Sequence, residues 1–250
     1  MPKQAASNLI HLADIHFTYD QVEVLHGISL CLERGLTLAL VGANGSGKST
    51  LLSLLAGLYV PSKGILKVAG HTSPKQAQAI RAMSGLVVQD ADLQILGATV
   101  GEDLCLGLDP VDAAGMLEAK GLAANFRLED LWEEPVQSLS WGQKRKLCIA
   151  ATLRRKPHLL LLDEPFSGLD YPGVREMRSV LMANKAVGLT QIISAHDIEP
   201  LADIADLWAI LERGRLVALG TATDIFPFLS RHHVRPPCSW QAGLGLRPWE

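Results

Sequence analysis

One nine-residue segment, GANGSGKST at residues 42–50, constrains the fold of this chain more than any other feature. It follows the apolar run 36–41, which is typical of a strand, and precedes the apolar run 51–56, which is typical of a buried helix. The order of strand, glycine-rich loop, Lys-Ser and helix matches the pattern GxxxxGK[ST] in the context that makes it a phosphate-binding loop. The alternative is a glycine-rich turn that binds nothing, but the flanking pattern favours the phosphate site.

The residue types of this loop suit the phosphates of a nucleotide. Glycines allow backbone angles that are closed to other residues, so that N–H groups can turn inward around anionic oxygens. The helix that begins near Lys48 directs its positive dipole end to the same place. Lys48 is expected to reach the β- and γ-phosphates, and Ser49 to offer its hydroxyl to Mg²⁺. The predicted phosphate-binding residues are Gly42, Ala43, Asn44, Gly45, Ser46, Gly47, Lys48, Ser49 and Thr50.

Composition excludes several other classes of protein. Hydrophobic residues make up 48% and charged residues 20% of the 250 residues, as in an ordinary folded protein. The formal net charge of −3 argues against non-specific nucleic-acid binding. Residues 1–7 lack the apolar core of a signal peptide, and no apolar run reaches the ~18 residues needed to cross a bilayer. Four widely spaced cysteines are predicted to be buried free thiols in a reducing compartment, namely Cys31, Cys105, Cys148 and Cys238.

Hydrophobic patterning predicts alternating strands and helices. Strands are expected at 9–19, 22–32, 36–41, 65–69, 85–89, 158–163 and 191–195, with a hairpin at 207–219. Helices are expected from Lys48 to near Gly57 and at 74–83, 140–155 and 172–185. Between residues 90 and 137 the strand signal disappears, which predicts a helical subdomain of about residues 90–155 within a single domain, 8–225. Residues 231–250 are rich in Pro, Gly and Trp and are predicted to be an irregular tail.

A second motif, Leu162-Asp163-Glu164, completes a two-part nucleotide site. An apolar strand that ends in Asp163 places a carboxylate at the edge of a parallel sheet, where ligands of such folds collect. Asp163 is expected to hold Mg²⁺, and Glu164 to accept a proton from the attacking water. The alternative is a strand that happens to end in acidic residues.

A third motif lies at the start of the helix expected at 140–155. Ser140 is a good N-cap residue, and a helix N-terminus is an anion site. One nucleotide needs one set of phosphate-loop donors, so this second anion-binding terminus is surplus within one chain. We therefore expect Ser140 and its neighbours to serve the nucleotide of a second molecule.

Taken together, these motifs resemble the ATP-binding cassette (ABC) ATPase family over residues 8–225. The family's glutamine loop falls on Gln89, its signature on 139–143, its D-loop on 167–170 and its switch histidine on His196. Tyr19 matches the aromatic residue that stacks on adenine, although alone it could be an ordinary strand-end tyrosine. The resemblance implies an α/β P-loop NTPase with a mixed RecA-like core sheet, an antiparallel β-subdomain and a helical subdomain.

The resemblance also implies the roles of particular residues toward ATP and Mg²⁺. Glu164, His196 and Gln89 would be the catalytic residues. Ser49, Gln89 and Asp163 would be the metal ligands. The residues Tyr19, Ser140, Gly142 and Gln143 would join the phosphate loop in binding ATP. The chain departs from the family at Trp141, where the signature usually has Gly, and we expect this ring to pack against a facing subunit.

Within the family, residues 89–103 resemble the energy-coupling-factor importers, including cobalt and nickel systems. These carry a similar acidic, Gln-containing stretch, which we expect to bind a membrane subunit around Asp92 and Gln94. The run Lys144-Arg145-Lys146 is also common there, although it could equally be a solvated helix face. His232, His233 and Cys238 could form a metal site, but exposed polar residues in a Pro-rich tail are the favoured interpretation.

The sequence therefore predicts the ATP-hydrolysing subunit of a membrane importer, of energy-coupling-factor type, for a transition-metal ion (cobalt or nickel) or a vitamin. Expected partners are a second ABC ATPase, in a homodimer or heterodimer, and a transmembrane subunit at the cytoplasmic face of the cell membrane; no nucleic acid is expected. The alternative is a soluble ABC ATPase of DNA repair or translation, although the chain shows no coiled-coil heptads and holds one cassette. A P-loop kinase would not need the anion site at Ser140.

Overall fold

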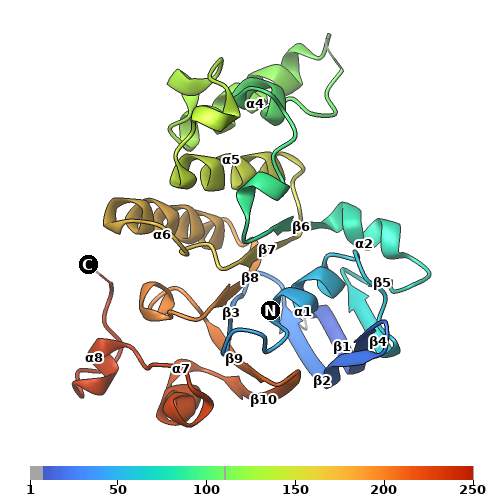
Figure 1. Ribbon diagram of the computed structural model, residues 1–250, viewed down its shortest axis with the longest axis vertical. Coiled ribbons are helices and arrows are strands. Elements are labelled where there is room, and N and C mark those ends of the chain that lie inside the picture. The colour runs from blue at the N-terminus through green and yellow to red at the C-terminus, as the bar shows by residue number, and fades with distance from the viewer. Residues whose placement is uncertain (1–7, 110, 250) are drawn as a thin grey trace, which may run out of the picture.

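The computed structural model describes residues 8–109 and 111–249, and in these residues the strands form two sheets (Figure 1). The larger, six-stranded sheet has the order β10 (Arg215–Gly220), β9 (Leu207–Glu212), β3 (Thr37–Val41), β8 (Thr190–Ala195), β7 (Leu159–Asp163), β6 (Ser84–Val87). Only β10 is antiparallel to its neighbour. Every residue of β3, β7 and β8 is buried, because helices cover both faces of this sheet. Burial on both faces explains why these strands appear as largely apolar runs in the sequence.

The smaller, four-stranded sheet is antiparallel throughout. Its order is β2 (Val22–Glu33), β1 (Asn8–Tyr19), β4 (Lys63–Val68), β5 (His71–Thr72). Apolar side chains of β1 and β2, such as Ile10 and Ile28, are fully buried, while several of their neighbours face solvent. This pattern is that of a sheet with one face on the core.

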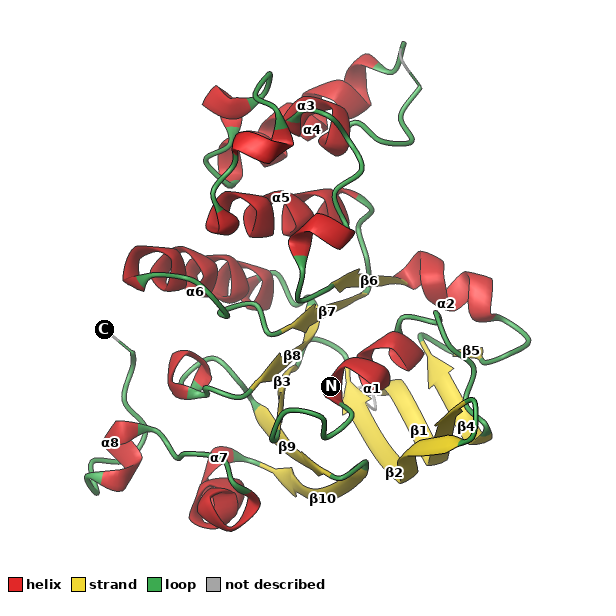
Figure 2. Cartoon of the chain, in the orientation of Figure 1, coloured by secondary structure: helices red, strands yellow, loops and turns green. Residues whose placement is uncertain are grey.

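Helix α1 (Lys48–Leu55) lies between the two sheets, as Figure 2 shows. Its four leucines are at most 1% exposed and pack with apolar residues of both sheets in one core cluster. Burying leucines on several sides of the helix stabilises this arrangement by about 1.5–3 kcal/mol for each side chain. The phosphate-loop segment, which precedes α1, is thereby anchored at the centre of the molecule.

The other large helices form a layer on the opposite side of the core sheet. Between β6 and β7 the chain forms α3 (Val100–Leu104), α4 (Ala113–Asn125) and α5 (Trp141–Arg154), and α6 (Tyr171–Ala186) follows β7 (Figure 1). Each of these four helices begins after a side-chain cap, from Thr99, Asp112, Ser140 and Asp170 in turn. The fold class expected from the sequence is confirmed. Within the described ranges, no helix combines the length and apolar character needed to cross a membrane.

Several short elements differ from the expected ones. The helix expected at 74–83 begins only at α2 (Ala77–Met83), and the strand expected at 85–89 ends at Val87. A 3₁₀ helix, Phe226–His232, follows α7 (Ala222–Ile225) directly. The tail beyond it, described to residue 249, is mostly irregular but contains the one-turn helix α8 (Cys238–Gln241). Trp240 of α8 packs edge-on against Phe226, with ring centroids 5.4 Å apart, so the tail is attached to the core.

The prediction of buried thiols is wrong for two of the four cysteines. All four are free, but Cys31 and Cys238 are exposed, Cys105 is half-buried and only Cys148 is buried. Burial raises the pKa of the Cys148 thiol to about 12. Cys31 lies in an apolar run but points to the solvent face of β2, because successive side chains of a strand alternate between its faces.

Candidate active site

The phosphate loop connects β3 to α1, and its backbone requires glycine at Gly42. A Cβ atom there would lie 2.1 Å from the carbonyl oxygen of Leu211, at the end of β9. The loop can therefore pass β9 only without a side chain at this position. Ser46 is 5% exposed, and its hydroxyl has no hydrogen-bond partner among the described residues. A buried hydroxyl without a partner is expected to donate its hydrogen to an acceptor atom of a ligand. A phosphate oxygen is an acceptor of this kind.

Lys48 is buried at the first position of α1 and is held by the loop. Its ammonium donates to the carbonyl oxygens of Gly42 and Ala43, at 2.8 and 3.2 Å. It also lies 3.6 Å from Oε1 of Glu164. One cation and one carboxylate thus meet at the mouth of the loop, with both side chains at most 10% exposed.

A cavity of about 340 Å³ opens beside this pair. It is lined by Val24, Asn44, Gly45, Gly47, Lys48, Ser49, Thr50, Gln89 and Glu164. Gln89 comes from the segment after β6 and is exposed, so it reaches the cavity from the entrance to the helical layer. The phosphate loop, the predicted base and the glutamine loop therefore meet at one cavity.

Tyr19, which pairs with Val22 at the end of β1, is not among the residues that line the cavity. Its ring packs edge-on against Phe17 and Tyr59, with centroids 4.7 and 5.5 Å away, and the residue is 40% exposed. A hydrogen bond with Tyr19 raises the pKa of Tyr59. Val24 lines the cavity and Tyr59 supports the aromatic group, although neither was predicted. No pattern in the sequence connects Tyr59 with Tyr19, because the two lie far apart along the chain.

Asp163 and Glu164 stand at the end of β7, where Ser194 of β8 holds both of them. The two strands are in register, with Asp163 opposite Ser194. The Ser194 hydroxyl donates to Oδ1 of Asp163 at 2.5 Å and accepts from the backbone N–H of Glu164 at 2.9 Å. Ser194 is fully buried and was missed, because a serine near the end of a strand belongs to no recognisable motif in the sequence.

The side chain of Glu164 is fixed at both oxygens. Oε2 lies 2.8 Å from Nδ1 of His196, and Oε1 faces Lys48. The His196 side chain is 53% exposed, whereas that of Glu164 is 10% exposed. Glu164 also has a left-handed backbone (φ 48°), which places its side chain at the turn beyond the strand. Such unfavourable backbone angles cluster at functional sites.

The three predicted metal ligands offer donors that fit Mg²⁺. Ser49, Gln89 and Asp163 present a hydroxyl, an amide oxygen and a carboxylate, and Mg²⁺ binds oxygen ligands and retains several waters. Ser49 and Gln89 line the cavity. Asp163 is not among the residues that line it; its Oδ1 accepts from Ser194, so its other carboxylate oxygen is the one that would act toward Mg²⁺, through water.

The signature segment lies apart from this cavity. Ser140 caps α5 through a capping box: its Oγ accepts from the Gln143 N–H at 3.3 Å, and Oε1 of Gln143 accepts from the Ser140 N–H at 2.7 Å. The hydroxyl hydrogen of Ser140 remains available as a donor. Ser140, Gly142 and Gln143 line a cavity of about 150 Å³ that they share with Asp170, not the cavity of the phosphate loop.

The basic run after the signature is not a solvated helix face. Lys144 pairs with Asp92 at 2.6 Å, and Lys146 pairs with Glu176 at 2.9 Å. Arg145 is fully buried, and burial lowers its pKa. All three cations therefore connect α5 to other parts of the chain.

Of the two residues expected to bind a membrane subunit, Asp92 is exposed and Gln94 is half-buried. Gln94 is tied inward, since its amide accepts from the Val88 N–H and donates to the Leu86 carbonyl and the Thr152 hydroxyl. Its neighbours Leu93 and Leu96 are 78% and 79% exposed. The segment therefore exposes these two leucines together with the Asp92 carboxylate, whose side chain is 57% exposed and pairs with Lys144.

In the tail, His232 is bonded to Glu212, with Nδ1 and Oε2 2.8 Å apart. This bond lowers the pKa of Glu212. Over the described residues, no group of three or more His, Cys, Asp or Glu side chains is arranged to hold a metal ion.

Comparisons with known proteins agree on one family. The family model described as ABC transporter matches residues 25–167. The cobalt import ATP-binding protein CbiO of Rhodobacter capsulatus is 39% identical, with 86% of this chain and 80% of that protein covered. The energy-coupling factor transporter ATP-binding protein EcfA of Methanoculleus marisnigri is 34% identical, with 96% and 87% covered. The structure of cbiO1 from Clostridium perfringens, part of the ABC transporter complex cbiONQ, has a TM-score of 0.79 and 30% identity, with 88% and 91% covered.

Proposed function

Because the chain belongs to the ABC transporter ATP-binding family and is an ATPase, we propose that it powers a membrane importer of the energy-coupling-factor type. The proposed cargo is a transition-metal ion, cobalt or nickel, since one relative is named for cobalt import and another for an energy-coupling factor. The observation that carries the proposal is the meeting of Lys48, Glu164 and Gln89 at one cavity, with exposed leucines directly after Gln89. The soluble alternative is not favoured by these relatives.

Glu164 is the proposed general base for the water that attacks the γ-phosphate. Its Oε2 is bonded to His196, so Oε1 is the oxygen that faces the cavity and Lys48. A γ-phosphate that takes the Lys48 ammonium frees Oε1 to accept the proton of the water. His196, more than half exposed, can then bond a phosphate oxygen while it keeps Glu164 in place.

The remaining residues of the site bind and orient the nucleotide. N–H groups at the start of α1 have no partner within the helix and would donate to the phosphates of a bound nucleotide. Ser49, Gln89 and Asp163 would hold Mg²⁺ directly or through water. When bound, Mg²⁺ neutralises charge that develops on the phosphates.

The site becomes complete only with a second cassette, identical or different. Ser140 and Gly142 line a separate cavity on α5 and do not reach the phosphate loop of their own chain. We infer that they bind the γ-phosphate held by Lys48 of the partner. The capping box supports this, because it orders the Ser140 hydroxyl and leaves its hydrogen free to donate.

The proposed contact with the transmembrane subunit is the segment around Leu93 and Leu96. Two leucines that are three residues apart and nearly four-fifths exposed favour contact with an apolar partner surface. Gln94 holds the segment from inside through the end of β6, and Asp92 holds it at the surface through Lys144. An apolar face of a cytoplasmic helix of the membrane protein suits this surface. The chain would then act as a peripheral subunit at the cytoplasmic face.

The test is cargo uptake by cells whose own copy of the gene is replaced. The variant Leu93→Lys with Leu96→Lys should abolish membrane association and uptake of radiolabelled cobalt or nickel, while the purified protein keeps its ATPase activity. The matched control is Leu117→Lys with Val187→Lys, two positions 74% and 81% exposed elsewhere on the surface. Normal uptake in the first variant would contradict the docking site. Uptake of a vitamin alone would change the cargo. Normal uptake of all these cargoes in cells that lack the gene altogether would reject the importer.

A further inference from the structure

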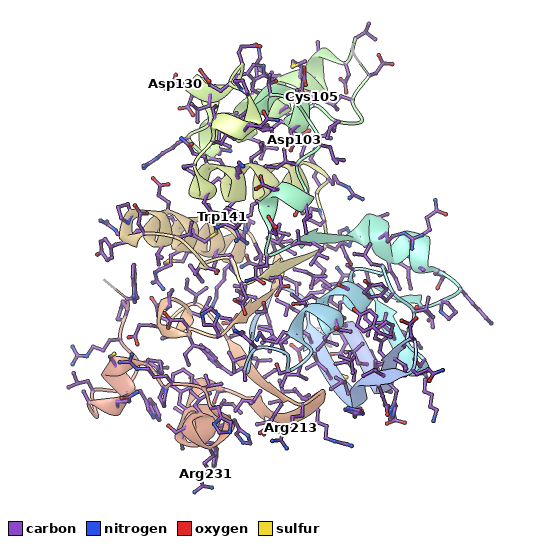
Figure 3. The ribbon with its side chains drawn as sticks, in the orientation of Figure 1. Asp103, Cys105, Asp130, Trp141, Arg213 and Arg231 are labelled. Atoms are coloured by element: carbon purple, nitrogen blue, oxygen red, sulfur yellow. The ribbon has the colours of Figure 1, made fainter. Side chains whose placement is uncertain are left out.

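Trp141, the residue that departs from the family signature, contacts its own chain. Its indole N–H donates to the carbonyl oxygen of Ser167 at 3.2 Å. The ring also lies against Gly168, where an added Cβ atom would be 3.1 Å from the indole nitrogen. Gly168 has a left-handed backbone (φ +75°), so glycine is favoured there for two reasons. Figure 3 places Trp141 at the side of α5 that faces α6.

Arg145 supports the same ring from within the molecule. Its guanidinium carbon is 5.7 Å from the centroid of the Trp141 ring. The guanidinium donates to the carbonyl oxygens of Val88 and Asp163, at 3.3 and 3.4 Å. Its Nε and Nη2 have no hydrogen-bond partner among the described residues, and the face of an aromatic ring attracts such a cation. The first turns of α5 are thus attached to the segment 163–168 at two points.

The segment that Trp141 holds is part of the site of hydrolysis. Ser167 and Gly168 line a cavity of about 220 Å³ together with Glu164 and His196. The N–H of Ser167 also donates to the carbonyl oxygen of Glu164 at 3.1 Å. A shift of the Ser167 peptide would therefore be transmitted to the backbone that carries the proposed base.

We propose that Trp141 is a positioning residue that fixes the loop 167–170 against α5 and so sets the position of Glu164. The inference rests on the proposed hydrolysis at Glu164 and adds a role that the proposed function does not assign. The indole N–H bond to Ser167 is its main contact. Because α5 belongs to the helical layer that also carries the exposed Leu93 and Leu96, the same contact links that layer to the base.

Two other roles for Trp141 make different predictions. A ring that only fills space should affect stability and leave the kinetics alone. A ring that only contacts a second chain through its exposed 38% should affect dimer affinity. A positioning role instead changes kcat while the KM for ATP and ATP-driven dimerisation stay the same, since Trp141 touches neither the phosphate loop nor the cavity beside it.

The decisive variant is Trp141→Phe, which keeps an aromatic ring and removes the N–H donor. We expect kcat to fall by about two- to tenfold, the worth of one hydrogen bond, with KM unchanged. Trp141→His, which keeps a ring N–H, should recover part of this loss. The matched control is Trp132→Phe, which removes an indole from the same helical layer far from Glu164 and should leave kcat unchanged.

A second measurement covers the case in which Trp141→Phe is unstable. Gly168→Ala should lower kcat, and its additional effect should be smaller in a Trp141→Gly background, because the ring that the new Cβ meets is then absent. Unchanged kcat in Trp141→Phe, or a loss confined to melting temperature or to dimer affinity, would overturn the inference. The variant Glu164→Gln distinguishes failure of the proposed base from failure of the proposed role of Trp141. If Glu164→Gln hydrolyses ATP normally, the proposed base is wrong. If Glu164→Gln loses hydrolysis while Trp141→Phe has a normal kcat, only the role of Trp141 is rejected.

Discussion

Glu164 combines an unfavourable backbone with a side chain held on several sides. Its φ of 48° lies in a region that costs about 1–3 kcal/mol for residues other than glycine. Contacts with Ser194, His196 and Lys48 offset this cost and leave one carboxylate orientation. Such a group can accept a proton without first reorganising, which is the property required of a general base.

Replacing Glu164 with Gln tests the base without changing its shape. An amide has no carboxylate to take the proton of the attacking water, so kcat should fall by about 10²–10⁴ while ATP still binds. Phosphate release and fluorescent-nucleotide binding measure the two quantities. Glu118→Gln, at a surface ion pair with Lys156, serves as the control and should be unaffected. Wild-type turnover in Glu164→Gln would remove Glu164 from the mechanism.

Residues with local motifs were predictable, and residues that act across the chain were not. Lys48 and Glu164 each stand at a fixed place in a short pattern, and the structure brings them within 3.6 Å. Ser194 and Gln94 matter through partners on other strands and helices, such as Asp163 and Thr152. One sequence without its pairings gives no sign of such contacts.

Helices and strands were also predictable where their signal is local in sequence, and not where it depends on tertiary contacts. Ser140 was predicted as the N-cap of α5 from its residue type, and the structure adds Gln143 as the second half of a capping box. The long apolar strands were equally clear. The elements β5, α7 and α8 are too short for a period to be detected, and their positions depend on tertiary contacts such as that of Trp240 with Phe226.

The hairpin of β1 and β2 carries a pH-sensitive pair. His16 Nδ1 lies 2.6 Å from Glu23 Oε1, and Asp14 lies 3.2 Å from the other ring nitrogen. The bond to Glu23 raises the pKa of His16 above its ordinary 6.5, and His16 lowers the pKa of Glu23 below its ordinary 4.5. The histidine stabilises the fold below pH 6.5 and loses this effect as pH rises through its folded pKa. The glutamate stabilises it above pH 4.5 and loses this effect as pH falls.

The pair therefore contributes fully between pH 4.5 and 6.5. Glu23→Gln should lower the pKa of His16, measured by NMR titration of the imidazole, and should reduce the loss of stability to urea between pH 6 and pH 8. The conservative control is Glu118→Gln, which faces no histidine in the described structure. His26 also contacts Glu23, so its titration should be followed in the same spectra. An unmoved His16 titration would show that the bond is absent in solution.

At the scale of the whole molecule, the two proposed halves of the nucleotide site line separate cavities. The phosphate loop opens to one cavity, whereas Ser140 and Gly142 line another beside Asp170. The sequence predicts both halves and the need for a second molecule, because each motif is local. Which molecule supplies the second half depends on a surface outside this chain, so sequence leaves both a homodimer and a heterodimer open.

The last prediction concerns that assembly. If two cassettes hold two ATP molecules head to tail, Glu164→Gln should dimerise when ATP is added, because the nucleotide that bridges the chains is no longer hydrolysed. Light scattering should then report twice the monomer mass, and dilution into ADP should return the monomer mass. Adding Ser140→Ala to this variant should weaken dimerisation, since it removes the hydroxyl donor to the γ-phosphate of the partner while Lys48 still binds ATP. Ser138→Ala is the matched control, because the Ser138 hydroxyl donates to Pro135 within its own turn. If dimerisation is equally strong with and without the Ser140 hydroxyl, another group makes the contact with the γ-phosphate. If the protein stays a monomer in ATP, both alone and with every candidate partner cassette, the shared site itself is contradicted.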